Sequence, residues 1–262
     1  PRSSSAASDV YKRQMENIMA KIDLSNISHS YNPNDDKPIY ALNPFSMTWE
    51  NGKRYAILGP SGCGKTTMLN IVSGLVKPTK GEILFDEKNV TNLQTESRNI
   101  SQVFQFPVIY NTMTVYDNLA FPLRCRGFSN EKIEERVKSV SDTLNLSSFL
   151  NSPARKLTAD QKQLISLGRG LVREDVAAVL MDEPLTVIDP DLKFRLRRNL
   201  KEINEQYKTT LVYVTHDQNE AMTFADNIIV MDQGEIVQVG LPKDLFETVS
   251  YTHLRAHETK RN

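Results

Sequence analysis

The sequence predicts an α/β fold in which helices cover both faces of a mainly parallel β-sheet. Two patterns support this prediction. A glycine-rich loop at residues 59–67 joins an apolar run, residues 55–58, to an apolar segment that follows it. After the loop, short apolar runs such as residues 176–181 alternate with charged stretches of helical character such as residues 190–207. Strands that alternate with helices usually form parallel sheets with helices on both faces.

Length and composition narrow the class of protein. The 262 residues suffice for one large or two modest domains with a sizeable core. Acidic and basic residues are equal in number, 32 of each, so no net field draws the chain to nucleic acid or to an anionic membrane. No apolar run has the length that spans a bilayer, and the two cysteines, Cys63 and Cys125, do not suggest a disulfide framework. We therefore expect a soluble, intracellular protein that does not bind nucleic acid.

Both ends of the chain differ from its centre. Residues 1–14 precede the first methionine, Met15, and residues 249–262 are similarly polar and without period. We interpret residues 1–14 as a non-native, disordered leader and residues 249–262 as a non-native tail. The folded domain is expected within residues 15–248.

The first elements are expected to be strands. Residues 22–31 and 39–49 alternate between apolar and polar side chains, and a polar break at residues 32–38 separates them. Residues 50–52, Glu-Asn-Gly, predict a turn, after which residues 55–58 form the strand that leads into the glycine-rich loop.

The loop itself fits the pattern G-x-x-x-x-G-K-[ST] in the strand–loop–helix context that a phosphate-binding loop requires. Its glycines let backbone N–H groups turn towards phosphate oxygens, and the helix that begins near Gly64 adds the positive end of its dipole. Lys65 adds a mobile charge, and the Thr66 hydroxyl can reach Mg²⁺. The alternative is a glycine-rich turn before a core helix. The candidate phosphate-binding residues are Gly59, Pro60, Ser61, Gly62, Cys63, Gly64, Lys65, Thr66 and Thr67.

Beyond the loop, the spacing of apolar residues first fits strands and then fits helices. Residues 82–85 and 100–106 predict strands, the second of them containing Gln105 near its end. From residue 114 to about residue 146 the apolar residues recur at helical intervals, with a helix start at Ser129. This stretch predicts a helical insertion between two β-rich halves.

An acidic pair follows the next buried strand. Residues 176–181 end in Asp182 and Glu183. Asp182 could hold Mg²⁺ through water, and Glu183 could orient or deprotonate a water that faces the γ-phosphate. Alternatively, the pair only caps a turn. Further on, a helix is predicted to begin at residues 189–190, and residues 209–214 predict a strand that leads to His216. Strands at residues 227–231 and 235–239 and a last helix from Pro242 complete the pattern.

Taken together, these motifs resemble those of the ATP-binding cassette (ABC) transporter ATPases over residues 20–247. Six motifs occur in the family's order and spacing: residues 59–67 match Walker A, Gln105 the Q-loop, residues 157–161 the signature position, residues 179–183 Walker B with the catalytic glutamate, residues 186–189 the D-loop with Asp189, and His216 the switch histidine. Tyr31 lies where the family stacks an aromatic ring on adenine. Singly, Gln105 could cap a strand end, Tyr31 could be an edge aromatic and His216 a surface residue; six motifs in order are much more specific.

The resemblance implies a P-loop NTPase cassette with a mainly parallel sheet core, an antiparallel β subdomain and a helical subdomain at about residues 107–172. It implies ATP and Mg²⁺ as cofactors. Lys65 would contact the β- and γ-phosphates, and Thr66, Gln105 and Asp182 would surround Mg²⁺. Glu183 would act as general base or water positioner, and His216 would contact the γ-phosphate.

Residues 115–123 and 238–242 look most like importer ATPases for sugars, glycerol or glycerol phosphate. The implied function is ATP hydrolysis that powers uptake of such a solute, at the cytoplasmic face of the inner or plasma membrane. The implied partners are transmembrane permease subunits, a second ABC ATPase and, indirectly, a periplasmic or extracellular solute-binding protein. Sugar-importer ATPases carry a further C-terminal regulatory domain, which we interpret as missing here.

The signature departs from the family pattern Leu-Ser-Gly-Gly-Gln. This chain has Leu157, Thr158, Ala159, Asp160 and Gln161. In the family, two cassettes meet head to tail, and the signature of one completes the ATP site of the other. A carboxylate about 5 Å from a phosphate charge, at an effective dielectric near 20, would cost roughly 3 kcal/mol. We therefore expect a heterodimer with a cassette whose signature is intact, and keep as the alternative a mainly structural partner with attenuated turnover.

Two other classes fit less well. ABC ATPases of chromosome and DNA-repair machines interrupt the cassette with long coiled coils, and this sequence has no sustained heptad run. A small-molecule P-loop kinase should lack both the signature segment and the switch histidine.

Overall fold

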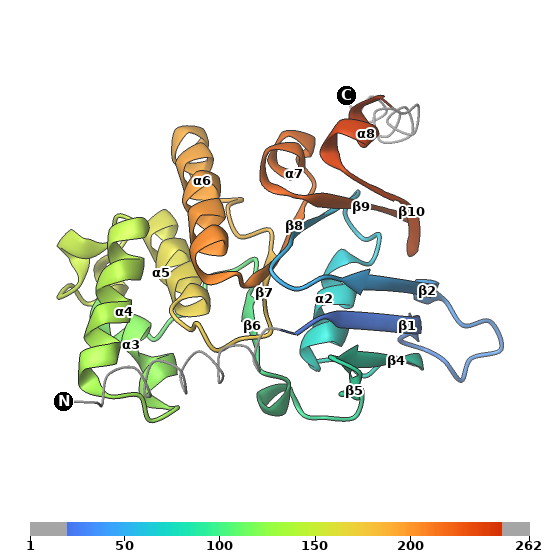
Figure 1. Cartoon of the computed structure of the whole chain (residues 1–262), viewed down its shortest axis with the longest axis horizontal. Helices are drawn as coiled ribbons and strands as arrows, with labels where there is room; N and C mark the ends of the chain where they lie inside the picture. The colour runs from blue at the N-terminus through green and yellow to red at the C-terminus, as the bar shows by residue number, and fades with distance from the viewer. Residues whose placement is uncertain (1–19, 248–262) are drawn as a thin grey trace, which may run out of the picture.

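The computed structural model describes residues 20–247, so the interpretations of residues 1–14 and 249–262 lie outside the described residues. The larger of its two sheets has six strands in the order β10-β9-β3-β8-β7-β6 (Figure 1). The strands β3, β6, β7, β8 and β9 pair in parallel, and β10 is antiparallel to β9. Their bounds are Arg54–Leu58 (β3), Ile100–Val103 (β6), Ala178–Asp182 (β7), Thr210–Thr215 (β8), Asn227–Asp232 (β9) and Glu235–Gly240 (β10). The predicted α/β fold with a mainly parallel sheet is confirmed.

The second sheet is antiparallel, with four strands in the order β2-β1-β4-β5. The strands are Ile22–Ser30 (β1), Tyr40–Trp49 (β2), Lys80–Phe85 (β4) and Lys88–Asn89 (β5). It packs with helix α2, Lys65–Ser73, against one face of the larger sheet. This sheet is the antiparallel β subdomain that the family resemblance implied.

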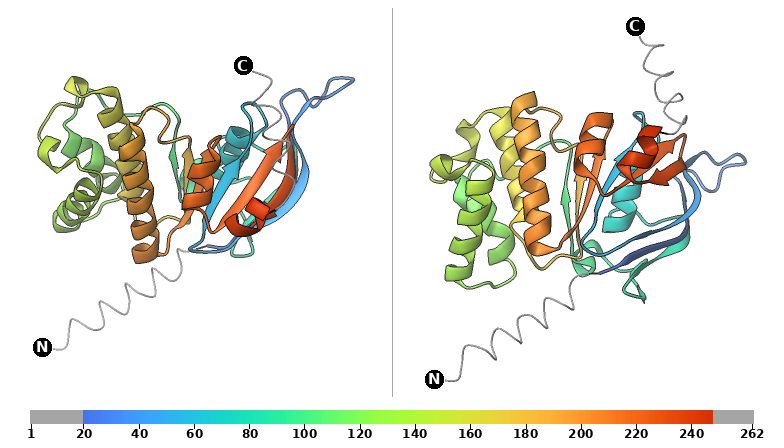
Figure 2. Two further views of the ribbon diagram at one scale, coloured as in Figure 1. Left: turned by 90° about the horizontal axis from the view of Figure 1, so that it is seen from above. Right: turned by 45° about the horizontal axis from the view of Figure 1, so that its top comes forward.

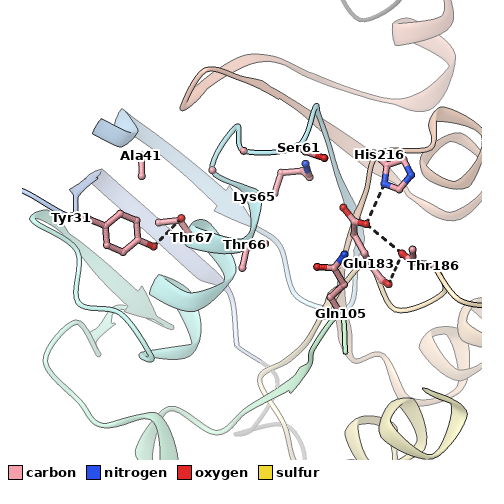
Figure 3. A pocket seen from close by; sticks show the side chains of 12 residues that line it. Tyr31, Ala41, Ser61, Lys65, Thr66, Thr67, Gln105, Glu183, Thr186 and His216 are labelled. Atoms are coloured by element: carbon pink, nitrogen blue, oxygen red, sulfur yellow. Dashed lines mark hydrogen bonds and ion pairs between the residues drawn. The ribbon is translucent and has the colours of Figure 1, made fainter. Parts of the chain in front are cut away.

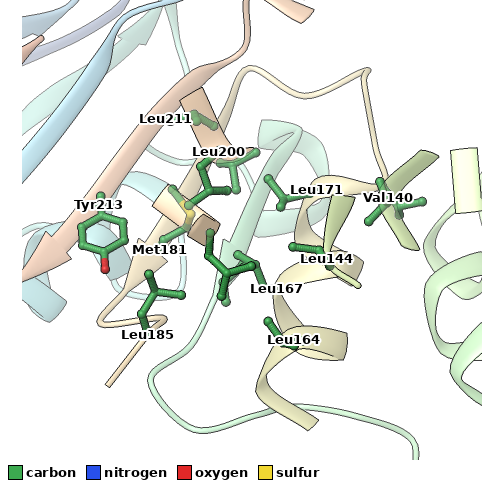
Figure 4. Close-up of a cluster of buried hydrophobic side chains, with 14 of the residues drawn as sticks. Val140, Leu144, Leu164, Leu167, Leu171, Met181, Leu185, Leu200, Leu211 and Tyr213 are labelled. Carbon is green, nitrogen blue, oxygen red and sulfur yellow. The ribbon is translucent and has the colours of Figure 1, made fainter. Parts of the chain in front are cut away.

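Alternate residues of the central strand face different cores. Tyr55 and Ile57 of β3 pack with α2 and the antiparallel sheet, whereas Ala56 and Leu58 pack with helices on the opposite face. Those helices are α5, Ala159–Leu171, α6, Pro190–Tyr207, and α7, Gln218–Phe224. Figure 4 shows part of this second core, in which side chains of β7, β8, α5 and α6 meet. Helices therefore cover both faces of the sheet, as its buried central strands require.

The helical insertion contains α3, Val115–Arg124, α4, Asn130–Thr143, and α5, with the 3₁₀ turns Ser147–Phe149 and Ala154–Lys156. It lies to one side of the sheets (Figures 1 and 2). Ser129 caps α4 by accepting a hydrogen bond from the Lys132 N–H, as the sequence predicted. The buried Arg136 of α4 donates to the carbonyl oxygens of Leu171 and Val172, which ties α4 to the end of α5.

One predicted strand is shorter than expected. Residues 100–106 were predicted as a strand, but β6 ends at Val103. Its only pairing among the described strands is with β7, from Ile100 opposite Ala178 to Val103 opposite Met181. Because β7 ends only one residue later, at Asp182, it does not reach as far as Gln105, which belongs to a loop. The remaining short elements are the 3₁₀ turn Thr95–Arg98 and helix α8, Pro242–Glu247. No helix within residues 20–247 has the length and apolar content that crossing a membrane demands.

Candidate functional site

A pocket of about 710 Å³ lies where strands of the larger sheet end at their carboxyl side (Figure 3). The glycine-rich loop follows β3, Gln105 follows β6, Glu183 follows β7 and His216 follows β8. Side chains that follow neighbouring parallel strands meet at one edge of the sheet, which is where open α/β sheets bind ligands. The lining residues are Tyr31, Ala41, Ser61, Gly62, Gly64, Lys65, Thr66, Thr67, Gln105, Glu183, Thr186 and His216.

Helix α2 presents an uncapped N-terminus to this pocket. Gly64, at the N-cap, has φ 102°, and no side chain accepts a hydrogen bond from the first turn, which also contains no acidic residue. A side chain at position 64 would also collide with the Ala41 carbonyl oxygen, 2.5 Å from an added Cβ. The free N–H groups and the helix dipole therefore suit an external anion.

The Lys65 ammonium lies inside the loop. Its Nζ donates to the carbonyl oxygens of Gly59 and Pro60, both at 2.8 Å, and its side chain is buried. The Cys63 sulfur lies 3.9 Å from the same nitrogen, and burial raises the pKa of the Cys63 thiol. The thiol is therefore neutral and fills space in the loop. The Lys65 ammonium beside it can bind a negatively charged ligand.

Thr66 and Asp182 form a hydrogen-bonded pair of polar side chains beside Lys65. The Thr66 hydroxyl donates to Oδ2 of Asp182 at 2.8 Å. Burial raises the pKa of Asp182; the Thr66 hydrogen bond lowers it and the nearby Glu183 raises it. A hydroxyl, a carboxylate and the Gln105 amide are hard oxygen donors of the kind that Mg²⁺ takes. Among residues 20–247 no group of three or more His, Cys, Asp or Glu side chains could hold a metal ion.

Glu183 and His216 are brought together across two strand ends. His216 Nδ1 lies 3.2 Å from Oε2 of Glu183, and the backbone N–H of Glu183 donates to the Val214 carbonyl oxygen. Glu183 has φ 45°, in the left-handed region that is uncommon for a residue with a side chain. Figure 3 shows this pair beside the pocket. The imidazole is exposed to solvent, whereas the Glu183 side chain is mostly buried. A carboxylate held next to an imidazole in a pocket is suited to moving a proton.

Thr186 and Ala41 also line the pocket; the sequence placed Thr186 only at the start of the D-loop match and assigned Ala41 no role. The Thr186 hydroxyl lies 3.0 Å from the Glu183 carbonyl oxygen and 3.3 Å from its Oε2, so it holds the same carboxylate oxygen that His216 contacts. A hydroxyl three residues after an acidic residue at a strand end was the available signal for Thr186. Ala41 carries no such signal, because an apolar residue of β2 shows no chemistry.

Tyr31 follows β1 at the other end of the pocket. Its side chain is exposed, its hydroxyl lies 3.2 Å from the Thr67 hydroxyl, and its ring meets the His29 ring edge to face at 4.6 Å between centroids. An exposed ring fixed at two points is a flat surface on which a base can stack.

The predicted site residues that do not line the pocket fall into two sets: those directly behind the lining and those away from it. Of the phosphate-loop and acidic residues, Gly59, Pro60, Cys63 and Asp182 lie behind the pocket lining, in contact with Lys65 or Thr66. Asp189 does not line the pocket and instead caps α6 by accepting from the N–H groups of Asp191 and Leu192. Also absent from the lining are Leu157, Thr158, Ala159, Asp160 and Gln161.

This last segment forms the N-terminus of α5, which caps itself. The Thr158 hydroxyl accepts from the Gln161 N–H, and the Gln161 side chain accepts from the Thr158 N–H, a reciprocal capping box. The Thr158 hydroxyl, together with the N–H groups of Asp160 and Gln161, holds the pKa of the Asp160 carboxyl below its usual value. Asp160 thus stays ionised at the positive end of its own helix.

Comparisons with known proteins agree with this geometry. A family model described as ABC transporter matches residues 42–186, more than half of the chain. The sn-glycerol-3-phosphate import ATP-binding protein of Pectobacterium atrosepticum is 40% identical over 228 residues, which cover 87% of this chain and 62% of the relative. The trehalose/maltose import ATP-binding protein of Thermococcus litoralis is 40% identical over 220 residues, covering 82% and 59%. The chain therefore spans about three fifths of the length of these relatives.

Solved structures with this fold are also similar. A dimeric ATP-binding cassette described as a post-hydrolysis state bound to ADP and Pi superimposes with a TM-score of 0.76 at 29% identity, covering 84% of this chain and 98% of that one. A cassette described as part of an ABC transporter complex from Clostridium perfringens gives a TM-score of 0.76 at 26% identity, covering 86% and 90%.

Proposed function

Because the chain belongs to the ABC transporter family, we propose that it is an ATPase whose pocket binds ATP and hydrolyses it. The observation that carries this proposal is the uncapped N-terminus of α2 with the buried Lys65, placed opposite the Glu183–His216 pair. The N-terminus of α2 and Lys65 can bind the phosphates. The Glu183–His216 pair can accept a proton from the water that attacks the phosphate.

Each residue has a role in this proposal. The base stacks on Tyr31, and the phosphates accept hydrogen bonds from backbone N–H groups of the glycine-rich loop and the first turn of α2. Lys65 exchanges its two carbonyl partners for β- and γ-phosphate oxygens, which is favourable because phosphate is the more strongly charged acceptor. Glu183, held by Thr186, orients or deprotonates the water, and His216 contacts the γ-phosphate.

Mg²⁺ is part of the proposal. Thr66, Gln105 and Asp182 would hold it, and when bound it would neutralise phosphate charge. The short contact between Thr66 and Asp182 already places two of the three donor groups side by side.

The transport role rests on the relatives, two of which are described as import ATP-binding proteins for sn-glycerol-3-phosphate and for trehalose or maltose. We propose that the chain powers uptake of a sugar, glycerol or related polar solute, together with transmembrane permease subunits and, indirectly, a solute-binding protein. It would lie peripherally at the cytoplasmic face of the membrane. Four exposed apolar side chains next to Gln105 support permease contact through this segment: Phe104, Phe106, Val108 and Tyr110.

The second subunit is proposed to be a different cassette. In a head-to-tail dimer the N-terminus of α5 would face the partner's γ-phosphate, and here Thr158, Gln161 and the Asp160 carboxylate occupy it. The alternative function, a mainly structural partner with attenuated turnover, draws on the same observation. The complete Glu183–His216 pair favours hydrolysis.

ATP hydrolysis by the purified chain tests the main proposal, with Mg²⁺ present and absent and with Lys65→Ala as the variant. We expect Mg²⁺-dependent release of phosphate that Lys65→Ala removes. No binding of ATP to the unaltered chain would refute it.

The partner proposal needs a mixed assembly. The chain is combined with its own variant Thr158→Ser/Ala159→Gly/Asp160→Gly, which restores the family signature. We expect the mixture to hydrolyse ATP faster than the unaltered chain. Equal rates would show that the segment at residues 157–161 is not limiting and would remove the case for a heterodimer.

A further inference from the structure

Behind the candidate site, a buried carboxylate joins two elements that the proposed mechanism does not connect. Glu220 lies in the first turn of α7, four residues after His216, and its side chain is 7% exposed. None of the pocket-lining residues is Glu220, so it does not touch a bound ligand there. A buried acidic side chain is costly unless it is fully partnered, so its partners indicate what it holds.

One oxygen of Glu220 holds the end of β8. Oε2 accepts from the Tyr213 hydroxyl at 2.8 Å and from the Thr215 hydroxyl at 2.9 Å. Thr215 is the residue immediately before His216, and its Oγ1 also accepts from the N–H of Asp217, the residue immediately after. The backbone on both sides of His216 is thereby fixed to one carboxylate through one hydroxyl.

The other oxygen of Glu220 holds helix α6. Oε1 lies 3.4 Å from Nζ of Lys193 and 3.4 Å from a guanidinium nitrogen of Arg197, two cations one turn apart on α6. Both side chains are at least three-quarters buried, so solvent screens these ion pairs little. The Lys193 N–H in turn donates to the carbonyl oxygen of Asp189, which caps α6.

We propose that Glu220 is a positioning residue that sets the place of His216 against Glu183 and couples that pair to helix α6. The connection runs from Lys193 and Arg197 through Glu220 to Thr215, and then through His216 to Glu183. A displacement of α6 would be passed to the imidazole, because each link is either a direct polar contact or the peptide bond between Thr215 and His216. The catalytic meaning of this coupling rests on the proposed ATP hydrolysis; the coupling itself does not.

The test follows the His216 ring by NMR in the full chain with ¹³C-labelled histidine, without nucleotide, with the signal assigned through His216→Gln. We expect Glu220→Gln and Thr215→Val each to shift or broaden the His216 signal. Tyr213→Phe, which removes a hydrogen bond to the same oxygen but not next to His216, and Glu202→Gln, from the exposed Arg198–Glu202 pair on α6, should leave it in place.

Thermal unfolding of each variant separates this role from simple support of the fold, because a loss of stability alone does not move a native-state signal. Thr215→Val keeps the carboxylate and both cations, so it remains informative should Glu220→Gln fail to fold. An unchanged His216 signal in Thr215→Val, or an equal shift in Tyr213→Phe, would overturn the proposal.

Hydrolysis measurements complete the test. Glu220→Gln should lower kcat several-fold while the Kd for ATP stays the same, since Glu220 acts through His216 and not on the nucleotide. Equal loss of binding and turnover would count against the proposal. Absence of ATP binding in the unaltered chain would instead refute the proposed function and leave the NMR result standing.

Discussion

Two helix N-termini of this chain, those of α2 and α5, are built in opposite ways. At α2 the N-cap is Gly64, no side chain caps the first turn and the first turn itself contains no acidic residue, although the pocket opens onto it. At α5 Thr158 and Gln161 cap each other and Asp160 adds a negative charge. The comparison teaches that a helix N-terminus is available to an external anion only where the chain leaves its own N–H groups unsatisfied. In this chain α2 is available and α5 is not.

The largest effect should come from the pocket that α2 serves. Glu183→Gln removes the group that takes a proton while it keeps the shape and the Thr186 contact. We expect hydrolysis to fall about 10²–10⁴-fold with ATP binding retained. Rapid quench of phosphate release and equilibrium binding of ATP measure the two quantities separately. Retained hydrolysis in Glu183→Gln would show that α2 and Lys65 suffice and that Glu183 is not the proton acceptor.

The next effect should come from α5. Asp160→Asn removes the charge at this N-terminus but keeps the size of the side chain. Since solvent screens this partly exposed carboxylate, we expect about 1–2 kcal/mol less repulsion of a partner's phosphate, or roughly a 5–30-fold gain in ATP-driven dimerisation. Size-exclusion chromatography of the Glu183→Gln background with ATP measures it. Asp191→Asn, an acidic residue in the first turn of α6, is the matched control.

A stability measurement sharpens the description of the α2 side. Because the pKa of Asp182 is raised in the folded state, the contribution of this group to stability is fully present below its unfolded value near 3.8 and is lost as pH rises through the folded pKa. Asp182→Asn should therefore raise Tm by a few degrees at pH 7 without Mg²⁺ and nucleotide. This increase in Tm should become smaller as the pH is lowered from 7 towards 4, which calorimetry can measure. A lower Tm for Asp182→Asn at pH 7 would contradict the prediction.

The smallest effect concerns the cap of α5. Thr158→Ala removes the hydroxyl that caps the Gln161 N–H, and we expect a loss of about 1 kcal/mol in the free energy of unfolding. Thr158→Ser retains the hydroxyl and is the matched control. Urea unfolding measures both. An unchanged stability in Thr158→Ala would mean that the reciprocal cap does not satisfy α5, and the contrast with α2 would weaken.

Much of this molecule could be predicted from local patterns. Period and turn residues predicted the α/β fold, the helical insertion and the N-cap at Ser129, because each of these depends on neighbours within a few residues. The end of β6 was missed. The length of a strand depends on how far its partner runs beside it, and the sequence of residues 100–106 does not say that only Ile100–Val103 pair with β7.

The sequence by itself determined which chemical groups this protein has: a loop for phosphate, an acidic pair after a strand, a histidine after another, and a signature segment that departs from its family. Only the tertiary structure decided which groups meet. Strand register sets His216 against Glu183, and helix packing sets Glu220 between β8 and α6. The Glu183–His216 contact joins two strand ends that are 33 residues apart, and the order of residues along one segment does not encode the register between two.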